Sequence, residues 1–408
     1  MSSEDNELLT RVENGAPMGE MLRNNYWFPA IIAQTLIPGG NPMPVRLLGE
    51  NLVAFRSNDG RVGIFDEHCP HRRASLLLAR NEDNALRCIY HGWKFGVDGE
   101  VLEVPTEPND PAAFCKNVPL RSYPTREAAG IVWIWMGRGE PMRWPDFEFM
   151  NVPEGRVHTV HQRVRCNWVQ DVEGGLDSAH VSILHSHWLR DVGIGDAGVD
   201  VAPTYEFDMQ NSGYCYAALR KLRDGTFYTR VTQFVMPWYA FIAPEEMPEG
   251  DRLVIFSTPV DDTNTVHWML RYNRVRTLKP SYVNPVDDPS NFPPAAPGNR
   301  DTVWGQDRDA MRRGHFSGFH HINTEDFAVA ESQGPIADRS KEYLNSGDRA
   351  VVQFRKQLLQ TAKEYAAGKK MSLAQHDEIN YAEARAAAFI LRPGEDWHAA
   401  YRDKGQAA

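Results

Sequence analysis

Two short segments that each carry one cysteine and one histidine constrain this chain most. They are Cys69-Pro70-His71 and Cys88-Ile89-Tyr90-His91, which read C-x-H and C-x-x-H. Thiolates and imidazoles are metal ligands, and two separate loops can share a metal centre only if the fold brings them together. A zinc finger would use C-x2-4-C followed by H-x3-5-H, and the mixed pairs do not fit that spacing. The pattern instead favours a two-iron cluster with unequal ends.

Unequal ends would give such a cluster a particular redox range. Two thiolates would hold one iron, and two neutral imidazoles would hold the other. Replacing two anionic ligands by neutral ones raises the reduction potential well above that of an all-cysteine cluster. Such a cluster accepts electrons readily from a flavin or ferredoxin donor and can still pass them on. We therefore interpret the first part of the chain as an electron carrier.

A second group of metal-ligating side chains lies in the segment Asn167–His185. Its members follow the spacing E-x3-D-x2-H-x4-H and are Glu173, Asp177, His180 and His185. On a regular α-helix, His180 and His185 would point about 140° apart and could not share one metal. We therefore expect the helix that begins near Val169 to end or bulge before His185, with Gly174-Gly175 providing backbone freedom.

Two histidines and one carboxylate form the facial triad of oxygen-activating iron(II) enzymes, which leaves positions open for oxygen and substrate. The local spacing supplies the histidines but not the carboxylate. Taken singly, either histidine would more often be an ordinary core or surface residue. Their joint occurrence with the upstream Cys/His pairs favours a second iron site.

Turn signals and hydrophobic periodicity place both motifs in a β-rich chain. Alternating runs meet at three hairpin signals, Asn58-Asp59-Gly60, Asp98-Gly99 and Asp224-Gly225. Further strands are predicted over 131–136, 156–164, 252–259 and 265–272. Helices are predicted over 18–26, from about 169, over 347–365 and over 372–390. The proline-rich stretch 279–299 is interpreted as a surface loop, or alternatively as a lid.

A stretch rich in glycine, proline and charge, GRGEPMRWPDFEFMNVPEG, suggests a domain boundary near residue 150. We expect an N-terminal helical segment (1–44), a cluster-binding domain (45–150) and a catalytic domain with C-terminal helices (151–408). The length of 408 residues agrees with about two or three domains.

Composition bears on the partners of the chain. The formal net charge of −10 argues against nucleic acid, because phosphate binding needs a basic face. No stretch approaches the roughly 20 apolar residues of a membrane helix, and the polar N-terminus does not read as a secretory signal. A cytoplasmic location is expected. The three cysteines outside the motifs are expected to be buried thiols rather than disulfides: Cys115, Cys166 and Cys215.

The stretches CPHRRASL and CIYHGWKFGVDG resemble the Rieske domain of the Rieske non-haem iron aromatic ring-hydroxylating oxygenases. The first form, with Arg73 where many members carry glycine, resembles the phthalate 4,5-dioxygenase-like branch. The resemblance implies a [2Fe-2S] cluster, and Arg72 and Trp93 would pack around it. Its ligands would be Cys69 and Cys88 on one iron, and His71 and His91 on the other.

The same resemblance implies the third ligand of a mononuclear Fe(II). The stretch NTEDFAVAESQGPIADRS is similar to the surroundings of the family's ligand aspartate, which matches Asp326. Glu325 is its nearest rival, and an acidic loop that caps a helix is the structural alternative. Asp326 would complete the site with His180 and His185.

Asp177 matches the bridging aspartate of the family. It would hydrogen-bond His180 and reach His91 of the partner subunit, so that electrons cross a subunit interface. A head-to-tail contact of this kind closes into a ring, which implies a homotrimer or a hexamer. Glu173 is expected to support the site.

The implied fold is α+β, with an antiparallel β Rieske domain and a catalytic domain whose long curved antiparallel sheet is flanked by helices. The implied activity is that of the oxygenase component, which uses O2 and two electrons from NAD(P)H. A separate flavin/iron–sulfur reductase would supply the electrons, since the chain has no dinucleotide fingerprint.

The first expectation for the reaction is hydroxylation of an aromatic carboxylate, as in phthalate-like dihydroxylation. The alternative is monooxygenase-type aryl-ether cleavage or O-demethylation of a methoxylated or phenoxy aromatic acid. Two remote alternatives are an electron-transfer Rieske protein without catalysis and a zinc module that binds a partner.

An aromatic carboxylate would need a cation in the pocket. Arg220 and Arg230 flank the turn at Asp224-Gly225. A two-residue turn would pair Leu219 with Arg230 and would point the two arginines to opposite faces of the hairpin. We therefore expect at most one of them to enter the pocket.

Overall fold

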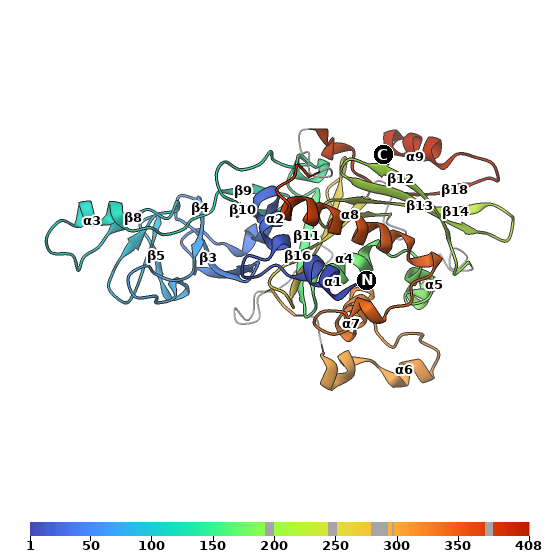
Figure 1. Cartoon of the computed structure of the whole chain (residues 1–408), viewed down its shortest axis with the longest axis horizontal. Coiled ribbons are helices and arrows are strands. Elements are labelled where there is room, and N and C mark those ends of the chain that lie inside the picture. The colour runs from blue at the N-terminus through green and yellow to red at the C-terminus, as the bar shows by residue number, and fades with distance from the viewer. Residues whose placement is uncertain (192–199, 244–250, 279–292, 296–297, 372–377, 408) are drawn as a thin grey trace.

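The computed structural model describes residues 1–191, 200–243, 251–278, 293–295, 298–371 and 378–407. The molecule is elongated, with a β-rich N-terminal part at one end and a larger part built on one sheet at the other (Figure 1). Both parts are antiparallel throughout their named strands, which confirms the expected α+β class. No helix among the described residues is long and apolar enough to cross a membrane.

Three small sheets build the described N-terminal part. The first has the order β1 (Trp27–Ile32), β10 (Ile131–Trp135) and β9 (Thr125–Ala128). The second contains β2 (Met43–Leu47), β3 (Glu50–Arg56) and β4 (Val62–Asp66). The third contains β5 (Arg80–Glu82), β6 (Ala85–Arg87), β7 (Lys94–Phe95) and β8 (Val101–Glu103), and α3 (Pro111–Asn117) follows it. The first two predicted hairpin turns are confirmed by the β3–β4 and β7–β8 pairings.

The larger part is built on an eight-stranded sheet. Its order is β11 (Val157–Val164), β17 (Thr265–Asn273), β16 (Asp251–Pro259), β15 (Tyr239–Ile242), β14 (Phe227–Val235), β13 (Gly213–Lys221) and β12 (Thr204–Gln210). The eighth strand, β18 (Ala387–Leu391), pairs with β14 over residues 227–231, whereas the short β15 pairs with β14 only over 233–235.

The predicted helix over 372–390 is wrong in its described part. Residues 381–383 form one 3-10 turn, and β18 follows. The alanine-rich sequence before Phe389 suits a helix as well as a strand. Phe389 and Leu391 are buried against Cys215 and Val231 while Ile390 is exposed, which is the alternation of a strand. The edge of β14 beyond β15 gives this segment its hydrogen-bond partner.

The register predicted for the β13–β14 hairpin is also wrong. Lys221 pairs with Phe227, so the connection is longer than two residues. Arg220 therefore pairs with Tyr228, and Arg230 pairs with Ala218. Because cross-strand partners and alternate residues share a face, Arg220 and Arg230 lie on the same face of the sheet.

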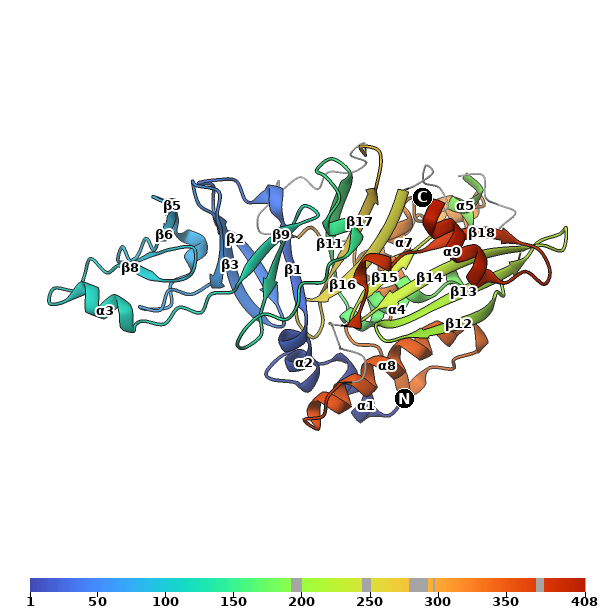
Figure 2. The ribbon, with the colours of Figure 1, turned by 90° about the horizontal axis from the view of Figure 1, so that it is seen from above.

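Helices cover both faces of the sheet (Figures 1 and 2). On one face, α4 (Trp168–Leu176) packs on β15, β16 and β17, with α7 (Ile322–Ser332) beside it. The helix α8 (Arg349–Ala366) contacts α4 and β13, and it also contacts α1 (Ser3–Thr10) and α2 (Pro17–Asn25). On the opposite face lies α9 (Trp397–Ala407). Two short helices, α5 (Ser186–Asp191) and α6 (Arg308–Arg312), complete the set described.

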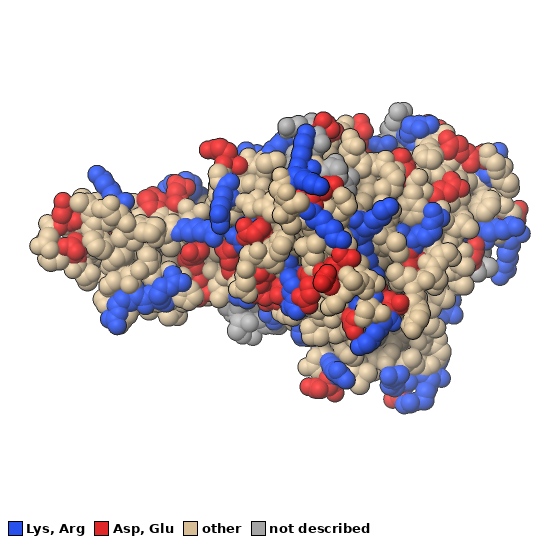
Figure 3. Space-filling model, viewed as in Figure 1, with Lys and Arg blue, Asp and Glu red and all other residues tan. Residues whose placement is uncertain are grey.

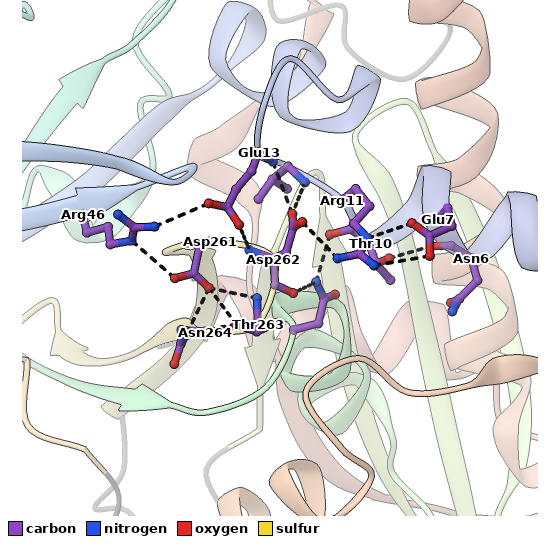
Figure 4. Close-up of polar contacts among 12 residues, drawn as sticks. Asn6, Glu7, Thr10, Arg11, Glu13, Arg46, Asp261, Asp262, Thr263 and Asn264 are labelled. Atoms are coloured by element: carbon purple, nitrogen blue, oxygen red, sulfur yellow. Dashed lines mark hydrogen bonds and ion pairs between the residues drawn. The ribbon is translucent and has the colours of Figure 1, made fainter.

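A polar network ties the N-terminal segment to both parts of the molecule (Figure 4). Asp262, in the turn between β16 and β17, accepts a hydrogen bond from the backbone N–H of Glu13. The side chain of Glu13 contacts Arg46 of β2. Asn167, at the start of α4, donates to the carbonyl oxygens of Thr10 and Asp262. The beginning of α4 is thus held by two segments that are distant in the sequence.

The largest hydrophobic core continues across the predicted domain boundary near residue 150, because Trp133 of β10 stacks on Phe256 of β16. The boundaries themselves stay a prediction. Residues 279–292 and 296–297 of the proline-rich stretch lie outside the described residues. On the face drawn in Figure 3, acidic and basic side chains are interspersed without a continuous basic surface.

Candidate metal centres

Two turns at the tip of the N-terminal part bring the paired cysteines and histidines together. Cys69 and Cys88 are buried, and the ring centroids of His71 and His91 lie 4.4 Å apart. Burial raises the pKa of the Cys69 thiol to about 11, and the neighbouring Cys88 adds to this effect. A cationic centre is therefore needed to hold both sulfurs as thiolates.

The two turns share one backbone arrangement. The N–H of Arg73 donates to the carbonyl oxygen of Cys69 at 2.9 Å, and the N–H of Gly92 donates to that of Cys88 at 3.0 Å. Arg73 and Gly92 both adopt left-handed backbone conformations, with φ of 61° and 75°. Glycine adopts such a conformation at little cost, whereas Arg73 adopts it although residues with a side chain rarely do.

The histidine nitrogens of this region suit a metal. Nδ1 of His91 is buried and has no hydrogen-bond partner among the described residues. The ring of Trp93 stacks on His71 at 4.7 Å, and the guanidinium of Arg72 lies over Tyr90 at 5.3 Å. A buried imidazole nitrogen without a partner, next to two buried thiols, fits a ligand of a [2Fe-2S] cluster.

The second group of candidate ligands converges beneath α7. The Nε2 atoms of His180 and His185 lie 3.2 Å apart. Oδ1 of Asp326 lies 3.1 Å from Nε2 of His185 and 3.6 Å from Nε2 of His180. These three atoms can face one small volume, as the ligands of a single metal ion do. Two imidazoles and one carboxylate are the donor set of the facial triad.

Neither histidine lies on α4, because this helix ends before His180 rather than between the two histidines as expected. The helix α4 ends at Leu176, and Asp177 caps it with an extended backbone. His180 begins a 3-10 turn, and His185 directly precedes α5. Gly175 has a role other than the one expected, because an added Cβ there would lie 2.6 Å from Cδ1 of Ile255. This glycine allows α4 to lie close to the sheet.

Each of the two histidines has a carboxylate at its Nδ1 atom, away from the Nε2 atom that faces the candidate metal position. Oδ2 of Asp177 lies 3.2 Å from Nδ1 of His180, and Oε2 of Glu325 lies 2.5 Å from Nδ1 of His185. If each Nδ1–H donates to its carboxylate, each Nε2 keeps its lone pair for the metal. Glu325, the rival expected for the third ligand, is thus placed behind His185, and Ser317 donates a hydrogen bond to it.

In the absence of a metal, His185 and Asp326 shift each other's pKa values. Burial disfavours a charged His185, but Asp326 and Glu325 outweigh that effect and raise its pKa to about 9. Burial likewise works against a charged Asp326, yet His185 and His180 hold its pKa below the ordinary value. A proton on His185 thus compensates the negative charge of the buried carboxylates. A bound metal cation would take over this role.

Glu173 lies in a different environment. Arg339 donates to both of its carboxylate oxygens at 3.0 Å, and Arg355 donates to one of them at 2.6 Å. The side chains of all three residues are almost fully buried. Glu173 therefore joins α4 to the 3-10 turn Arg339–Lys341 and to α8, and its expected support of the metal site stays a prediction.

A cavity of about 690 Å³ opens above the three candidate ligands. Its apolar wall includes Val181, Leu184, Trp188, Ile242, Ile255 and Met269. Arg230 lines the cavity and donates to the carbonyl oxygen of Ala243 at 3.3 Å. Arg220 contacts Ser178 and Ser182 instead. Of the two hairpin arginines, only one therefore lines the cavity, as expected, although the register used to predict this was wrong.

His267 is a cavity residue that the sequence did not reveal. Its Nδ1 lies 2.9 Å from Oδ2 of Asp171, which also accepts a hydrogen bond from Ser257 at 2.6 Å. Burial opposes a charged His267, but Asp171 outweighs that effect and raises the pKa of His267 above its ordinary value. Asp171 stands two residues before Glu173 on α4, but nothing in the sequence links it to a histidine on β17.

Comparison with known proteins gives a consistent result. Residues 27–124 match the family described as Rieske [2Fe-2S] domain, and residues 134–407 match the family described as LigXa C-terminal domain like. The oxygenase subunit of phthalate 4,5-dioxygenase from Pseudomonas putida is 37% identical over 396 residues, which cover 90% of this chain and 88% of that protein.

Two further relatives extend the comparison. The oxygenase subunit of 5,5'-dehydrodivanillate O-demethylase from Sphingobium sp. (strain NBRC 103272 / SYK-6) is 31% identical, covering 90% of this chain and 82% of that protein. The solved terminal oxygenase of carbazole 1,9a-dioxygenase from Novosphingobium sp. KA1 has a TM-score of 0.59 at 21% identity, covering 88% of this chain and 99% of that one. The latter likeness concerns the fold.

Proposed function

The chain belongs to the terminal (alpha) oxygenase subunits of the Rieske non-haem iron oxygenases, and from this we propose a role for each of its two candidate centres. The Cys/His centre transfers electrons, and the His/Asp centre activates oxygen for reaction with an aromatic substrate. It is the oxygenase subunit of a multicomponent oxidoreductase that works with a ferredoxin or reductase. In our proposal the electrons come from NAD(P)H through a separate reductase in the cytoplasm.

The convergence of His180, His185 and Asp326 at the base of a largely apolar cavity carries this proposal. We assign these three residues to a mononuclear Fe(II), and Cys69, His71, Cys88 and His91 to a [2Fe-2S] cluster. When bound, the cluster supplies single electrons and the Fe(II) activates O2.

The protein's own side chains prepare and protect that chemistry. Asp177 and Glu325 orient the two imidazoles, and the apolar wall of the cavity excludes water from the reacting groups. Arg230 provides a cation in the same wall, which can hold an anionic substrate in one orientation.

Asp177 is also the residue we assign to the contact between subunits. Its side chain lines the cavity and is 25% exposed. The sheet β5–β8, which carries the Cys/His turns, lies at the far end of the molecule from α4 and α7, with the other two N-terminal sheets between them (Figures 1 and 2). Because the two centres are separated in this way within one chain, we propose that electrons pass between subunits of a homotrimer or hexamer.

We propose an aromatic carboxylate as the substrate and dihydroxylation as the reaction. The names of two relatives, phthalate 4,5-dioxygenase and 3-chlorobenzoate-3,4-dioxygenase, support this choice, and so does the buried Arg230. O-demethylation or ether cleavage of an aromatic acid is the second candidate, because one relative is a dehydrodivanillate O-demethylase and another a phenoxybenzoate dioxygenase.

Metal analysis and product analysis test the proposal together. The anaerobically purified protein should contain about three irons and two acid-labile sulfides per chain and should be red-brown. With a compatible reductase, NADH, O2 and a panel of benzoates, phthalates and methoxybenzoates, the expected product is a cis-diol. Formaldehyde or a released phenol would instead establish the second candidate, and a colourless protein containing zinc alone would overturn both.

A further inference from the structure

Arg220 lies beneath the loop that connects α4 to α5. It is 1% exposed, on the face of β13 that points toward α4. Its Nε donates to Oγ of Ser182 at 3.0 Å, and its Nη2 donates to Oγ of Ser178 at 3.2 Å and to the carbonyl oxygen of Ser178. Ser178 and Ser182 flank His180, and Ser178 directly follows Asp177. One guanidinium thus contacts the loop on both sides of the candidate ligand.

Tyr216 adds a second contact from the same strand. It stands four residues before Arg220 and therefore on the same face of β13. Its hydroxyl donates to the carbonyl oxygen of Leu176, the last residue of α4, at 2.6 Å. The final carbonyl groups of a helix lack partners within the helix. Tyr216 and Arg220 therefore fix the end of α4 and the first residues beyond it.

The chemistry of the guanidinium explains why an arginine stands at this position. Burying a charge is costly unless hydrogen bonds satisfy it, and an apolar side chain could fill the same volume more easily. The planar guanidinium has five donors in a fixed arrangement and can hold two separated acceptors at once. A lysine presents one point charge and cannot do so with the same geometry.

We propose that Arg220 is a positioning residue of the iron site. It touches neither the metal position nor the cavity, and it acts through Ser178 and Ser182 on Asp177 and His180. In this way it fixes the distance between the Asp177 carboxylate and Nδ1 of His180, and the direction of His180 Nε2. The inference deepens the proposed function and rests on it, because it assigns Arg220 to the same metal site.

Metal binding by the cluster-loaded protein tests this inference without relying on turnover. The mononuclear site is emptied with a mild chelator and titrated with Co(II), and the affinity and the high-spin Co(II) EPR spectrum are recorded while the oxidised cluster is EPR-silent. Replacing Arg220→Met should weaken Co(II) binding about 10- to 100-fold and change the spectrum. Arg220→Lys should restore only part of the affinity.

Arg230→Met is the matched control. Arg230 lies on the same face of the sheet and is also buried, at 5% exposure. Its loss should lower the resistance to denaturant by a similar amount, yet leave the Co(II) affinity and spectrum unchanged. A general loosening of the sheet would affect both variants alike, so equal losses of Co(II) affinity would overturn the inference.

A double variant covers the case in which Arg220→Met fails to fold. Ser178→Ala with Ser182→Ala removes the two hydroxyl acceptors but leaves Arg220 and the Ser178 carbonyl in place. It should weaken Co(II) binding about tenfold. Wild-type affinity and spectrum in this variant and in any folded Arg220 variant would overturn the inference. If the unmodified protein itself binds no Co(II) or Fe(II) at this site, the proposed function fails first.

Discussion

Glu325 and Asp326, consecutive residues of α7, lie at opposite ring nitrogens of the same imidazole. Oε2 of Glu325 is 2.5 Å from Nδ1 of His185, and Oδ1 of Asp326 is 3.1 Å from its Nε2. Neighbouring residues of a helix point about 100° apart. Both carboxylates can therefore reach His185 only because its ring lies beside α7, between the two side chains. The candidate metal ligand, Asp326, and the residue that orients His185, Glu325, are therefore positioned by the same turn of α7.

Replacing Glu325→Ala should weaken Fe(II) binding about 10- to 100-fold, because Nδ1 of His185 loses the carboxylate that fixes its tautomer and direction. Glu325→Gln, which keeps an acceptor but not the charge, should lie between this variant and the wild type. Titration of the chelator-treated protein with Fe(II) measures the effect. Unchanged affinity in Glu325→Ala would show that the 2.5 Å contact has no part in metal binding.

Replacing Asp177→Ala should weaken Fe(II) binding, as the loss of Glu325 does, and should nearly abolish turnover even when added Fe(II) keeps both metal sites largely occupied. The side chain contacts Nδ1 of His180 and is partly exposed, and in our proposal the partner subunit docks against it. The measurement is the single-turnover rate at which O2 oxidises the reduced cluster in the presence of substrate, together with iron and sulfide content. Near-normal, coupled turnover would refute the proposed electron path.

Replacing Glu173→Ala should destabilise the fold by about 3–5 kcal/mol, because it leaves the guanidinium groups of Arg339 and Arg355 buried without their shared carboxylate. Denaturant unfolding followed by circular dichroism measures the change. The exposed pair of Asp338 and Lys341 is the control, since Asp338→Ala should change the free energy of unfolding far less. A loss for Glu173→Ala no larger than that of the control would contradict the buried network.

The metal-free protein should lose stability as the pH rises from about 6.5 to about 9. The pKa of His185 is raised from its ordinary 6.5 to about 9 in the folded, metal-free state. The folded state then binds the proton more tightly than the unfolded state, so this contribution is complete below pH 6.5 and is lost through pH 9.

The same proton must leave Nε2 of His185 before a metal can bind there, so Fe(II) affinity should rise over the same pH range. Thermal unfolding at several pH values, with and without metal, measures both effects. Asp326→Asn should reduce the pH dependence, because it removes one of the charges that raise the pKa of His185. A flat profile in the metal-free protein would contradict the assignment.

Replacing Arg230→Met should weaken the binding of an aromatic carboxylate at least tenfold, since hydrogen bonds to charged groups contribute about 1.5–3 kcal/mol. The binding of the corresponding neutral amide should change little. Equilibrium dialysis of benzoate and benzamide analogues against the metal-loaded protein separates the two. Equal losses for the acid and the amide would point to a loss of cavity shape rather than of charge.

Local chemistry made several features predictable from the sequence. The Cys/His pairs and the spacing of His180 and His185 identified two metal-type motifs. The second required that the two histidines not share a regular helix, and α4 ends at Leu176, before both of them. The hairpin at Asn58-Asp59-Gly60 followed from turn residues whose backbone preferences are local. Family resemblance added Asp326, which no local spacing could have provided.

Other features depend on partners that are distant in the sequence. The segment of β18 becomes a strand because β14 offers it a free edge, and its alanine-rich sequence does not decide between helix and strand. The β13–β14 register depends on how Leu222 and Thr226 close the turn, and one residue of slip moves Arg220 from one face to the other. Sequence alone could not tell which arginine faces the cavity.

The sequence by itself determined which ligand types are present and that they form two groups, because the identity and spacing of Cys, His and Asp are chemical facts of the chain. Only the tertiary structure decided which carboxylate serves which nitrogen. Glu173, Asp177, Glu325 and Asp326 have nearly the same chemistry, and they differ in what the fold places within hydrogen-bonding distance of them. Function at such a site follows from distances of a few ångströms, which the packing of α4 and α7 on the sheet sets.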